Sequence, residues 1–218
     1  MRLTTAIFDM DGLLLDSERL LINEWLAAAE RRQIPLAAEQ LIPSIGLVGK
    51  ACADLLAAAV GGHSTAPSIR DEIHLRYAQG VIQPGLRPGA RQLLGRLHQQ
   101  RVRCAVASSS PVAQIEHRLG QHDLLRYLGS WAGGDEVPNS KPDPDVYLLA
   151  AERLKVAPAQ CLAFEDSDHG AEAALAAGMQ VVLVPDLKIP PPDLRHRCLH
   201  VADSLDELGD WVIERLVG

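Results

Sequence analysis

The chain has 218 residues, of which 47% are hydrophobic and 22% are charged, and its net charge is −7. A chain of this size and composition buries one core, or one core with a small added domain, which argues against disorder. Its 21 basic residues are scattered singly or in pairs, so nucleic acid is a disfavoured partner. Neither a signal peptide nor a long apolar run is visible, and we expect a cytoplasmic protein with no membrane partner.

Five short apolar runs along the chain predict β-strands, and helical patterns separate the later ones. Strands that are apolar throughout and alternate with helices indicate a parallel sheet covered on both faces. We therefore predict an α/β fold with a Rossmann-like parallel sheet, whose active site lies beyond the carboxyl ends of the strands. The predicted strands are Leu3–Phe8, Val102–Ala107, Gly129–Ala132, Cys161–Phe164 and Val181–Val184, and the predicted helices between them are 90–100, 112–120, 144–154 and 171–177.

The first predicted strand ends in two carboxylates one residue apart. Phe8 is followed by Asp9, Met10, Asp11 and Gly12, and the glycine lets the chain turn. Two acids at a strand end repel each other, and such repulsion is tolerated where a cation lies between them or one carboxyl stays protonated. A polar strand end with an ordinary turn would explain one aspartate, but the pair points to a catalytic site.

More than ninety residues separate the first two predicted strands, where a single crossover helix would be expected. This stretch has helix-compatible patterns over 20–32, 50–60 and 68–79, with prolines and glycines between them. We interpret residues 18–83 as an inserted small helical cap, and residues 1–17 with 84–218 as the α/β core. The segment 83–89, rich in proline and glycine, is a plausible hinge.

The second predicted strand runs into three serines followed by Pro111, which is placed to open a helix. Free backbone N–H groups at a helix start bind phosphate, and a serine hydroxyl adds a donor. Helix capping alone would explain one serine. Ser108 is therefore a candidate phosphate-binding residue only because the other motifs accompany it.

A lysine in a predicted loop is a further candidate site residue. Lys141 precedes Pro142 in the segment 139–144, and the prolines favour an extended path. Such a lysine is usually solvated. A site that holds several carboxylates and a phosphate needs positive charge, however, and Lys141 is the candidate.

A second pair of acids follows the fourth predicted strand, where Glu165 and Asp166 come directly after Phe164. The carboxyl ends of parallel strands converge, so these acids should lie near Asp9. Carboxylates from two strands, with room for water and phosphate oxygens, suit Mg²⁺. The alternative is capping of the next helix by Asp166 or Ser167.

Taken in order, the Asp-x-Asp-Gly, Ser, Lys and paired-acid motifs resemble the phosphatases of the haloacid dehalogenase superfamily over essentially the whole chain. The insert resembles the small helical cap of the β-phosphoglucomutase-like branch. This resemblance implies that Asp9 is the nucleophile, forming an aspartyl-phosphate, and that Asp11 is the general acid and base. It also implies a Mg²⁺ ion held by Asp9, Asp11, Glu165 and Asp166.

The same resemblance implies that Ser108, Ser109 and Lys141 hold the phosphoryl oxygens. The expected partner is a small phosphorylated metabolite such as a sugar phosphate, a polyol phosphate or pseudouridine 5′-phosphate, and the expected state is a monomer or weak homodimer. The greatest likeness is to the pseudouridine 5′-phosphatase and sugar-phosphate phosphatase group.

Residues at single positions help to distinguish this chain from enzymes of the superfamily that have other activities. Dehalogenases of the superfamily lack the second acid that is present here as Asp11. Where β-phosphoglucomutase carries a histidine and a cap arginine, this chain has Leu21 and Gly49. A phosphomutase or a phosphotransferase stays open as an alternative, and a non-catalytic binding or regulatory protein on the same fold is the alternative from another class.

Overall fold

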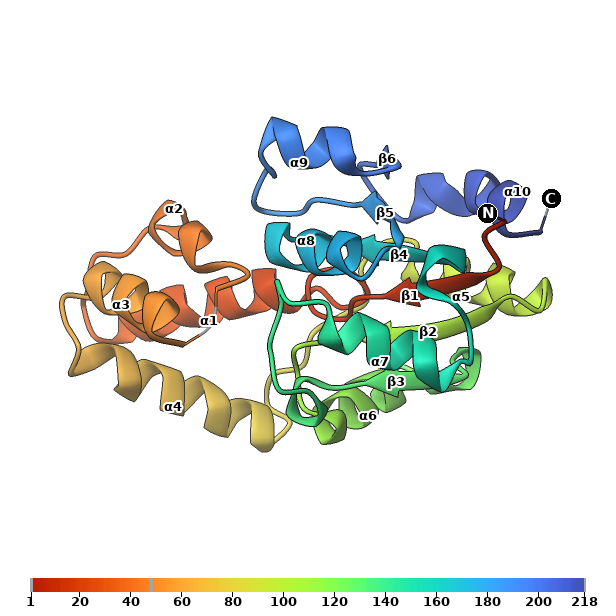
Figure 1. Cartoon of the computed structure of the whole chain (residues 1–218). Coiled ribbons are helices and arrows are strands. Elements are labelled where there is room, and N and C mark those ends of the chain that lie inside the picture. The colour runs from red at the N-terminus through yellow and green to blue at the C-terminus, as the bar shows by residue number, and fades with distance from the viewer. Residues whose placement is uncertain (1, 48, 218) are drawn as a thin grey trace. The chain divides into compact units, whose positions relative to one another are not determined.

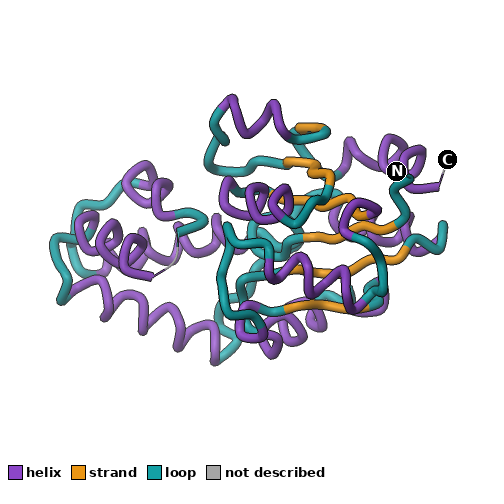
Figure 2. The backbone as a smooth tube through the Cα atoms, viewed as in Figure 1, coloured by secondary structure: helices purple, strands orange, loops and turns teal. Residues whose placement is uncertain are grey.

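The computed structural model describes residues 2–47 and 49–217, and the chain divides into two compact units. One unit is formed by Met1–Leu15 together with Leu86–Gly218, and the other is formed by Asp16–Gly85. The expected cap boundaries at residues 18 and 83 lie two positions inside the second unit. Figure 2 shows that the first unit contains the strands, whereas the second is built from helices and loops.

The first unit is built on a parallel six-stranded sheet, which confirms the predicted fold class. Its strand order is β3-β2-β1-β4-β5-β6, so β1 and β4 lie side by side near the middle (Figure 1). Five strands match the predicted runs within two residues at each end. The strands are β1 (Thr5–Phe8), β2 (Arg103–Ala107), β3 (Ser130–Ala132), β4 (Cys161–Glu165), β5 (Gln180–Leu183) and β6 (His200–Val201).

Alternation along the strands places their side chains on two buried faces. Phe8 on β1 and Phe164 on β4 share one face, where their rings stack with centroids 4.5 Å apart. Ile7 and Ala163, one position earlier on each strand, belong to the core on the opposite face. Because both faces are covered, the strands are apolar throughout, and polar groups gather at their ends.

Helices cover both faces of the sheet. The face of Phe8 is packed by α5 (Ala90–Gln99), α6 (Val112–Gln121) and α10 (Gly209–Val217). The face of Ile7 is packed by α7 (Asp145–Arg153), α8 (Asp168–Ala176) and α9 (Pro192–Arg197), of which α7 and α8 lie in front of the sheet in Figure 1. Helices α9 and α10 and the two-residue strand β6 lie outside the predicted elements.

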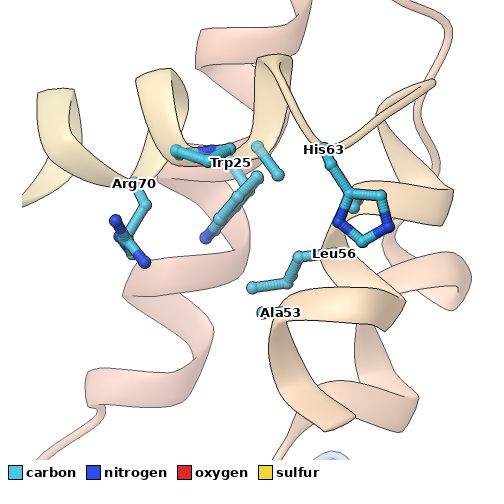
Figure 3. A pocket seen from close by; sticks show the side chains of 8 residues that line it. Trp25, Ala53, Leu56, His63 and Arg70 are labelled. Carbon is cyan, nitrogen blue, oxygen red and sulfur yellow. The ribbon is translucent and has the colours of Figure 1, made fainter. Parts of the chain in front are cut away.

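The second unit consists of α1 (Ser17–Arg31), α2 (Ala38–Leu41), α3 (Gly49–Ala59) and α4 (Thr65–Ala78). Helices α1 and α4 are joined by ion pairs, including Arg76 to Glu24 at 2.8 Å. A small cavity of about 60 Å³ lies among α1, α3 and α4, lined by Trp25, Leu56 and neighbouring side chains (Figure 3). Its lining is largely apolar, and it is too small for a phosphorylated metabolite.

None of the helices in residues 2–47 and 49–217 combines the length and apolar character needed to span a membrane.

Candidate active site

Asp9 lies immediately after β1, at the carboxyl edge of the sheet. Its backbone N–H donates to the carbonyl of Phe164 at 3.0 Å, which continues the pairing of β1 with β4. The residue is only 7% exposed. The chain then turns at Gly12, whose φ of 87° lies in the left-handed region that glycine adopts without strain. The strand end thus presents a buried carboxylate followed by a tight turn.

Lys141 joins three strand ends. Its Nζ donates to Asp9 Oδ1 after β1 at 2.6 Å, to the carbonyl of Ala107 on β2 at 3.0 Å, and to Glu165 Oε1 on β4 at 2.7 Å. A protonated lysine has three N–H donors, and all three are used here. Its side chain is 7% exposed. Lys141 is therefore a buried counter-ion of the carboxylates, and the solvated-lysine interpretation does not hold.

Glu165, the last residue of β4, is fully buried, and its carboxylate accepts four hydrogen bonds. Oε1 accepts from Lys141 and from the Tyr147 hydroxyl at 2.5 Å. Oε2 accepts from the Ser167 hydroxyl and from the backbone N–H of Asp166, each at 3.3 Å. Because hydrogen bonds satisfy both oxygens, this carboxylate can be buried at low cost.

Gly170 on α8 makes room for the Glu165 carboxylate. A Cβ atom at this position would lie 2.0 Å from Glu165 Oε1 and 2.1 Å from Oε2, far inside van der Waals contact. Any larger residue would displace the carboxylate from its donors. The α8 helix itself is capped by Ser167, whose hydroxyl accepts from the Gly170 N–H at 3.2 Å. Ser167 thus caps α8, and its hydroxyl also donates to Glu165 in the charge cluster.

Asp9, Glu165 and Asp166 form an acidic cluster with a shared centre. Each offers a carboxylate oxygen, and these oxygens lie within 4.8 Å of one another. All three residues are buried. Lys141 contacts two of these carboxylates, Asp9 and Glu165. A divalent cation prefers oxygen ligands of this kind, and the donor set fits Mg²⁺.

The environment of Asp9 changes its ionisation. Burial raises the pKa of Asp9 well above its ordinary value, Lys141 opposes this effect, and Glu165 adds to it. For Lys141, burial disfavours the charged form, but Asp9 and Glu165 together outweigh it and raise the pKa. Burial and the negative charges nearby likewise raise the pKa of Tyr147, which stays a protonated donor. Lys141 is thus held charged beside a carboxylate that resists ionisation until more positive charge arrives.

The side chain of Asp11 has different partners from those of Asp9. Oδ1 accepts from Arg118 Nη1 at 2.9 Å, and Oδ2 accepts from the Ser110 hydroxyl at 2.8 Å. Its side chain is 30% exposed. The structure therefore places the Asp11 carboxylate against α6 and the serine loop, outside the three-carboxylate cluster.

The predicted serines lie at the carboxyl end of β2. Ser108 is buried, its N–H donates to the carbonyl of Ala132 on β3, and its hydroxyl oxygen accepts from the N–H of Ser110 at 3.0 Å. Ser109 is exposed. The N–H of Val112, in the first turn of α6, donates to Asp135 at 3.0 Å. Asp135 therefore already occupies this donor of the helix start.

Three contributors to the site were missed by the sequence analysis: Tyr147, Gly170 and Arg118. Tyr147 and Arg118 sit in ordinary helical patterns, and nothing local marks their partners. Gly170 had a usable signal, since a glycine inside a helix costs stability and often has a packing reason.

Known proteins place the chain in a family. The haloacid dehalogenase-like hydrolase family matches residues 3–178. The "Probable pseudouridine-5'-phosphatase" of Drosophila melanogaster is 33% identical over 98% of this chain and 94% of its own length. The "Phosphorylated carbohydrates phosphatase" of Thermotoga maritima is 33% identical over 80% of this chain and 82% of its own length.

A solved structure has a similar fold. The "putative beta-phosphoglucomutase from Thermotoga maritima" superposes with a TM-score of 0.80 at 28% identity, covering 97% of this chain and 99% of that one. The chain therefore belongs to the haloacid dehalogenase-like hydrolases. Within them it is a phosphatase, that is, a phosphoric monoester hydrolase.

Proposed function

We propose that this protein is a Mg²⁺-dependent phosphatase that hydrolyses a small phosphorylated metabolite through an aspartyl-phosphate on Asp9. The observation that carries the proposal is the meeting of Asp9, Lys141, Glu165 and Asp166 at the carboxyl ends of β1 and β4. A nucleophilic carboxylate, a fixed cation and a group of carboxylates that could hold a divalent ion are what phosphoryl transfer with such an ion requires.

Mg²⁺ would be held by the carboxylates of Asp9 and Asp166 and by the backbone carbonyl of Asp11. The two oxygens of Glu165 already accept four donors, so Glu165 would act on the ion through water and through its contact with Lys141. When bound, the ion supplies charge neutralisation for the phosphoryl oxygens.

In the first half-reaction, an oxygen of Asp9 attacks phosphorus in line and the bond from phosphorus to the alkoxide oxygen breaks. Asp11 gives its proton to the departing alkoxide. In the second half-reaction, water attacks the phosphorus of the aspartyl-phosphate, Asp11 takes a proton from that water, and Asp9 is released with inorganic phosphate. Each turnover returns both aspartates to their starting state.

Lys141, Ser108 and the backbone N–H of Ser109 would position the phosphoryl group. The three N–H donors of Lys141 are used by Asp9, Ala107 and Glu165, so Lys141 would contribute its fixed positive charge. Ser108 is buried at the end of β2, next to the strand of Asp9, and its hydroxyl would be a donor. A charge and a donor that are already in place cost no reorganisation when charge develops on the transferring group.

The substrate class follows the relatives. Their names specify pseudouridine 5′-phosphate and phosphorylated carbohydrates, and we propose a metabolite of one of these two kinds for this chain.

The test is phosphate release from pseudouridine 5′-phosphate, hexose and hexitol phosphates and glycerol phosphate, with Mg²⁺ or with EDTA. The wild type is compared with Asp9→Asn and with a matched control, Asp210→Asn, which alters an exposed aspartate of the same unit. We expect release that needs Mg²⁺, is lost in Asp9→Asn and is retained in the control. Activity that persists in EDTA or in Asp9→Asn would contradict the proposal, and transfer to an added alcohol instead of water would indicate a phosphotransferase.

A further inference from the structure

The side chain of Asp11 is held at both oxygens by groups that the proposed mechanism does not use. Arg118 on α6 donates to Oδ1 at 2.9 Å, and the Ser110 hydroxyl donates to Oδ2 at 2.8 Å. Ser110 belongs to the loop after β2, so the two contacts come from separate elements. A carboxylate gripped at each oxygen from different sides has a defined orientation.

Arg118 is itself anchored. Its Nη2 donates to Gln114 Oε1 at 3.0 Å, and these two residues lie one helical turn apart on the same face of α6. The adjacent face of α6 buries Ile115 and Leu119 in the core. The Arg118 side chain is 19% exposed, so the guanidinium is held by the helix and by its partners, unlike a mobile surface arginine.

The two contacts occupy one acceptor position on each oxygen of Asp11. A carboxylate oxygen has two lone pairs, and each Asp11 oxygen uses one of them for its donor. One lone pair per oxygen therefore stays available, in a direction that Arg118 and Ser110 determine. General acid catalysis depends on this direction, because the acid must reach the oxygen that it protonates.

We propose that Arg118 is a positioning residue that, with Ser110, aims the general acid Asp11 at the leaving group. The proposal rests on the proposed function and adds a residue to it. Arg118 acts through Asp11 and contacts no reacting atom, so its contribution is confined to the step in which the leaving group receives a proton.

Because Arg118 would act only on protonation of the leaving group, the role can be tested with two substrates that differ in their need for that proton. An alkoxide leaving group, such as that of glycerol phosphate, needs protonation as it departs, whereas the phenolate of p-nitrophenyl phosphate is stable without a proton. The kcat/KM value reports the steps up to release of the alcohol. If Asp11 loses its orientation, kcat/KM for the alkyl ester should therefore fall and kcat/KM for the aryl ester should stay unchanged.

Arg118→Gln is compared with Arg118→Lys and with Arg197→Gln, a control that removes an exposed ion pair with Glu172. We expect Arg118→Gln to lower kcat/KM for glycerol phosphate by about tenfold or more and to change the aryl value by less than about twofold. Arg118→Lys should restore part of the loss, and the control should change neither value. In the Asp11→Asn background, Arg118→Gln should have no further effect.

An equal loss on both esters, no loss on either, or an additive loss in the double variant would overturn the role of Arg118 and leave the proposed function intact. Absence of phosphate release from the wild type would instead overturn the proposed function, and this inference with it. Circular dichroism and thermal unfolding check that Arg118→Gln folds. If it does not, Ser110→Ala removes the other contact on Asp11 and must show the same difference between the esters.

Discussion

Asp9 and Asp11 are the same residue type two positions apart, yet their surroundings differ. Asp9 is buried, bound by Lys141 and close to two further carboxylates. Asp11 is partly exposed and accepts from Arg118 and from Ser110. The first setting suits an atom that must attack in a water-poor site. The second suits a group that must exchange protons with solvent between half-reactions.

The charged groups around Asp9 also differ from those around Asp11. Asp9 shares Lys141 with the buried Glu165 and lies in a group of three carboxylates. Asp11 lies outside that group and accepts from Arg118 and Ser110. The proposed function therefore assigns the two aspartates of one strand end to different roles, one toward metal and phosphate and one toward a proton.

The largest effect should follow from removing the shared cation. Lys141→Ala leaves three buried carboxylates unopposed, and we expect it to lower kcat/KM by about 10²-fold to 10³-fold and the free energy of unfolding in EDTA by about 3 kcal/mol. Lys188→Ala, which removes a more exposed pair with Asp168, is the control and should cost less than about 1 kcal/mol. Equal effects of the two variants on stability would show that Lys141 is not a structural counter-ion.

Tyr147→Phe should have a smaller effect on the same cluster. It removes one of four donors to Glu165 and leaves the ring in place, so we expect a loss of about 1–2 kcal/mol in urea unfolding. The control is Tyr127→Phe, whose hydroxyl accepts from the exposed Arg126. If both tyrosine variants unfold at the same urea concentration, the buried hydroxyl makes no particular contribution to the cluster.

Two isosteric variants test the contrast between the aspartates directly. With EDTA present, Asp9→Asn should raise the melting temperature, because burial and Glu165 make the ionised carboxylate unfavourable. Asp11→Asn should lower it slightly, by less than about 1 kcal/mol in stability, because it breaks the pair with Arg118. Differential scanning fluorimetry at neutral pH measures both, and shifts of the same sign would remove the distinction.

The pH dependence has a definite sign. Because the pKa of Asp9 is raised in the folded protein, the folded state keeps a proton where the unfolded state has lost it. Asp9 therefore makes the metal-free protein less stable as pH rises from its ordinary pKa of 3.8 through the raised value. A bound cation must displace that proton, so Mg²⁺ should raise the melting temperature more as pH increases through this window.

Asp9→Asn is the matched control for that titration. It has no proton to displace at this position, so its Mg²⁺-induced shift should be smaller and should vary less with pH. A Mg²⁺ shift in the wild type that stays constant over the same range would contradict the raised pKa of Asp9.

The sheet was predictable because its strands are continuous apolar runs, and the acids at their ends stand out against such runs. Asp9 and Glu165 were expected to converge, and the parallel pairing of β1 with β4 brings them together. Strand β6 could not be predicted, because two residues carry no periodicity. The contact of Arg118 with Asp11 could not be predicted either, because the two residues lie 107 positions apart and a helical arginine has no local mark of such a contact.

The central claim is that Asp9 becomes phosphorylated, and acid-quenched mass spectrometry of the protein during turnover tests it most directly. We predict that a phosphoryl group accumulates on the peptide containing Asp9 when wild type, Mg²⁺ and a substrate are mixed, and that it is absent from Asp9→Asn. Substrate turnover with no phosphoryl group on that peptide, or with the group on another residue, would contradict the account.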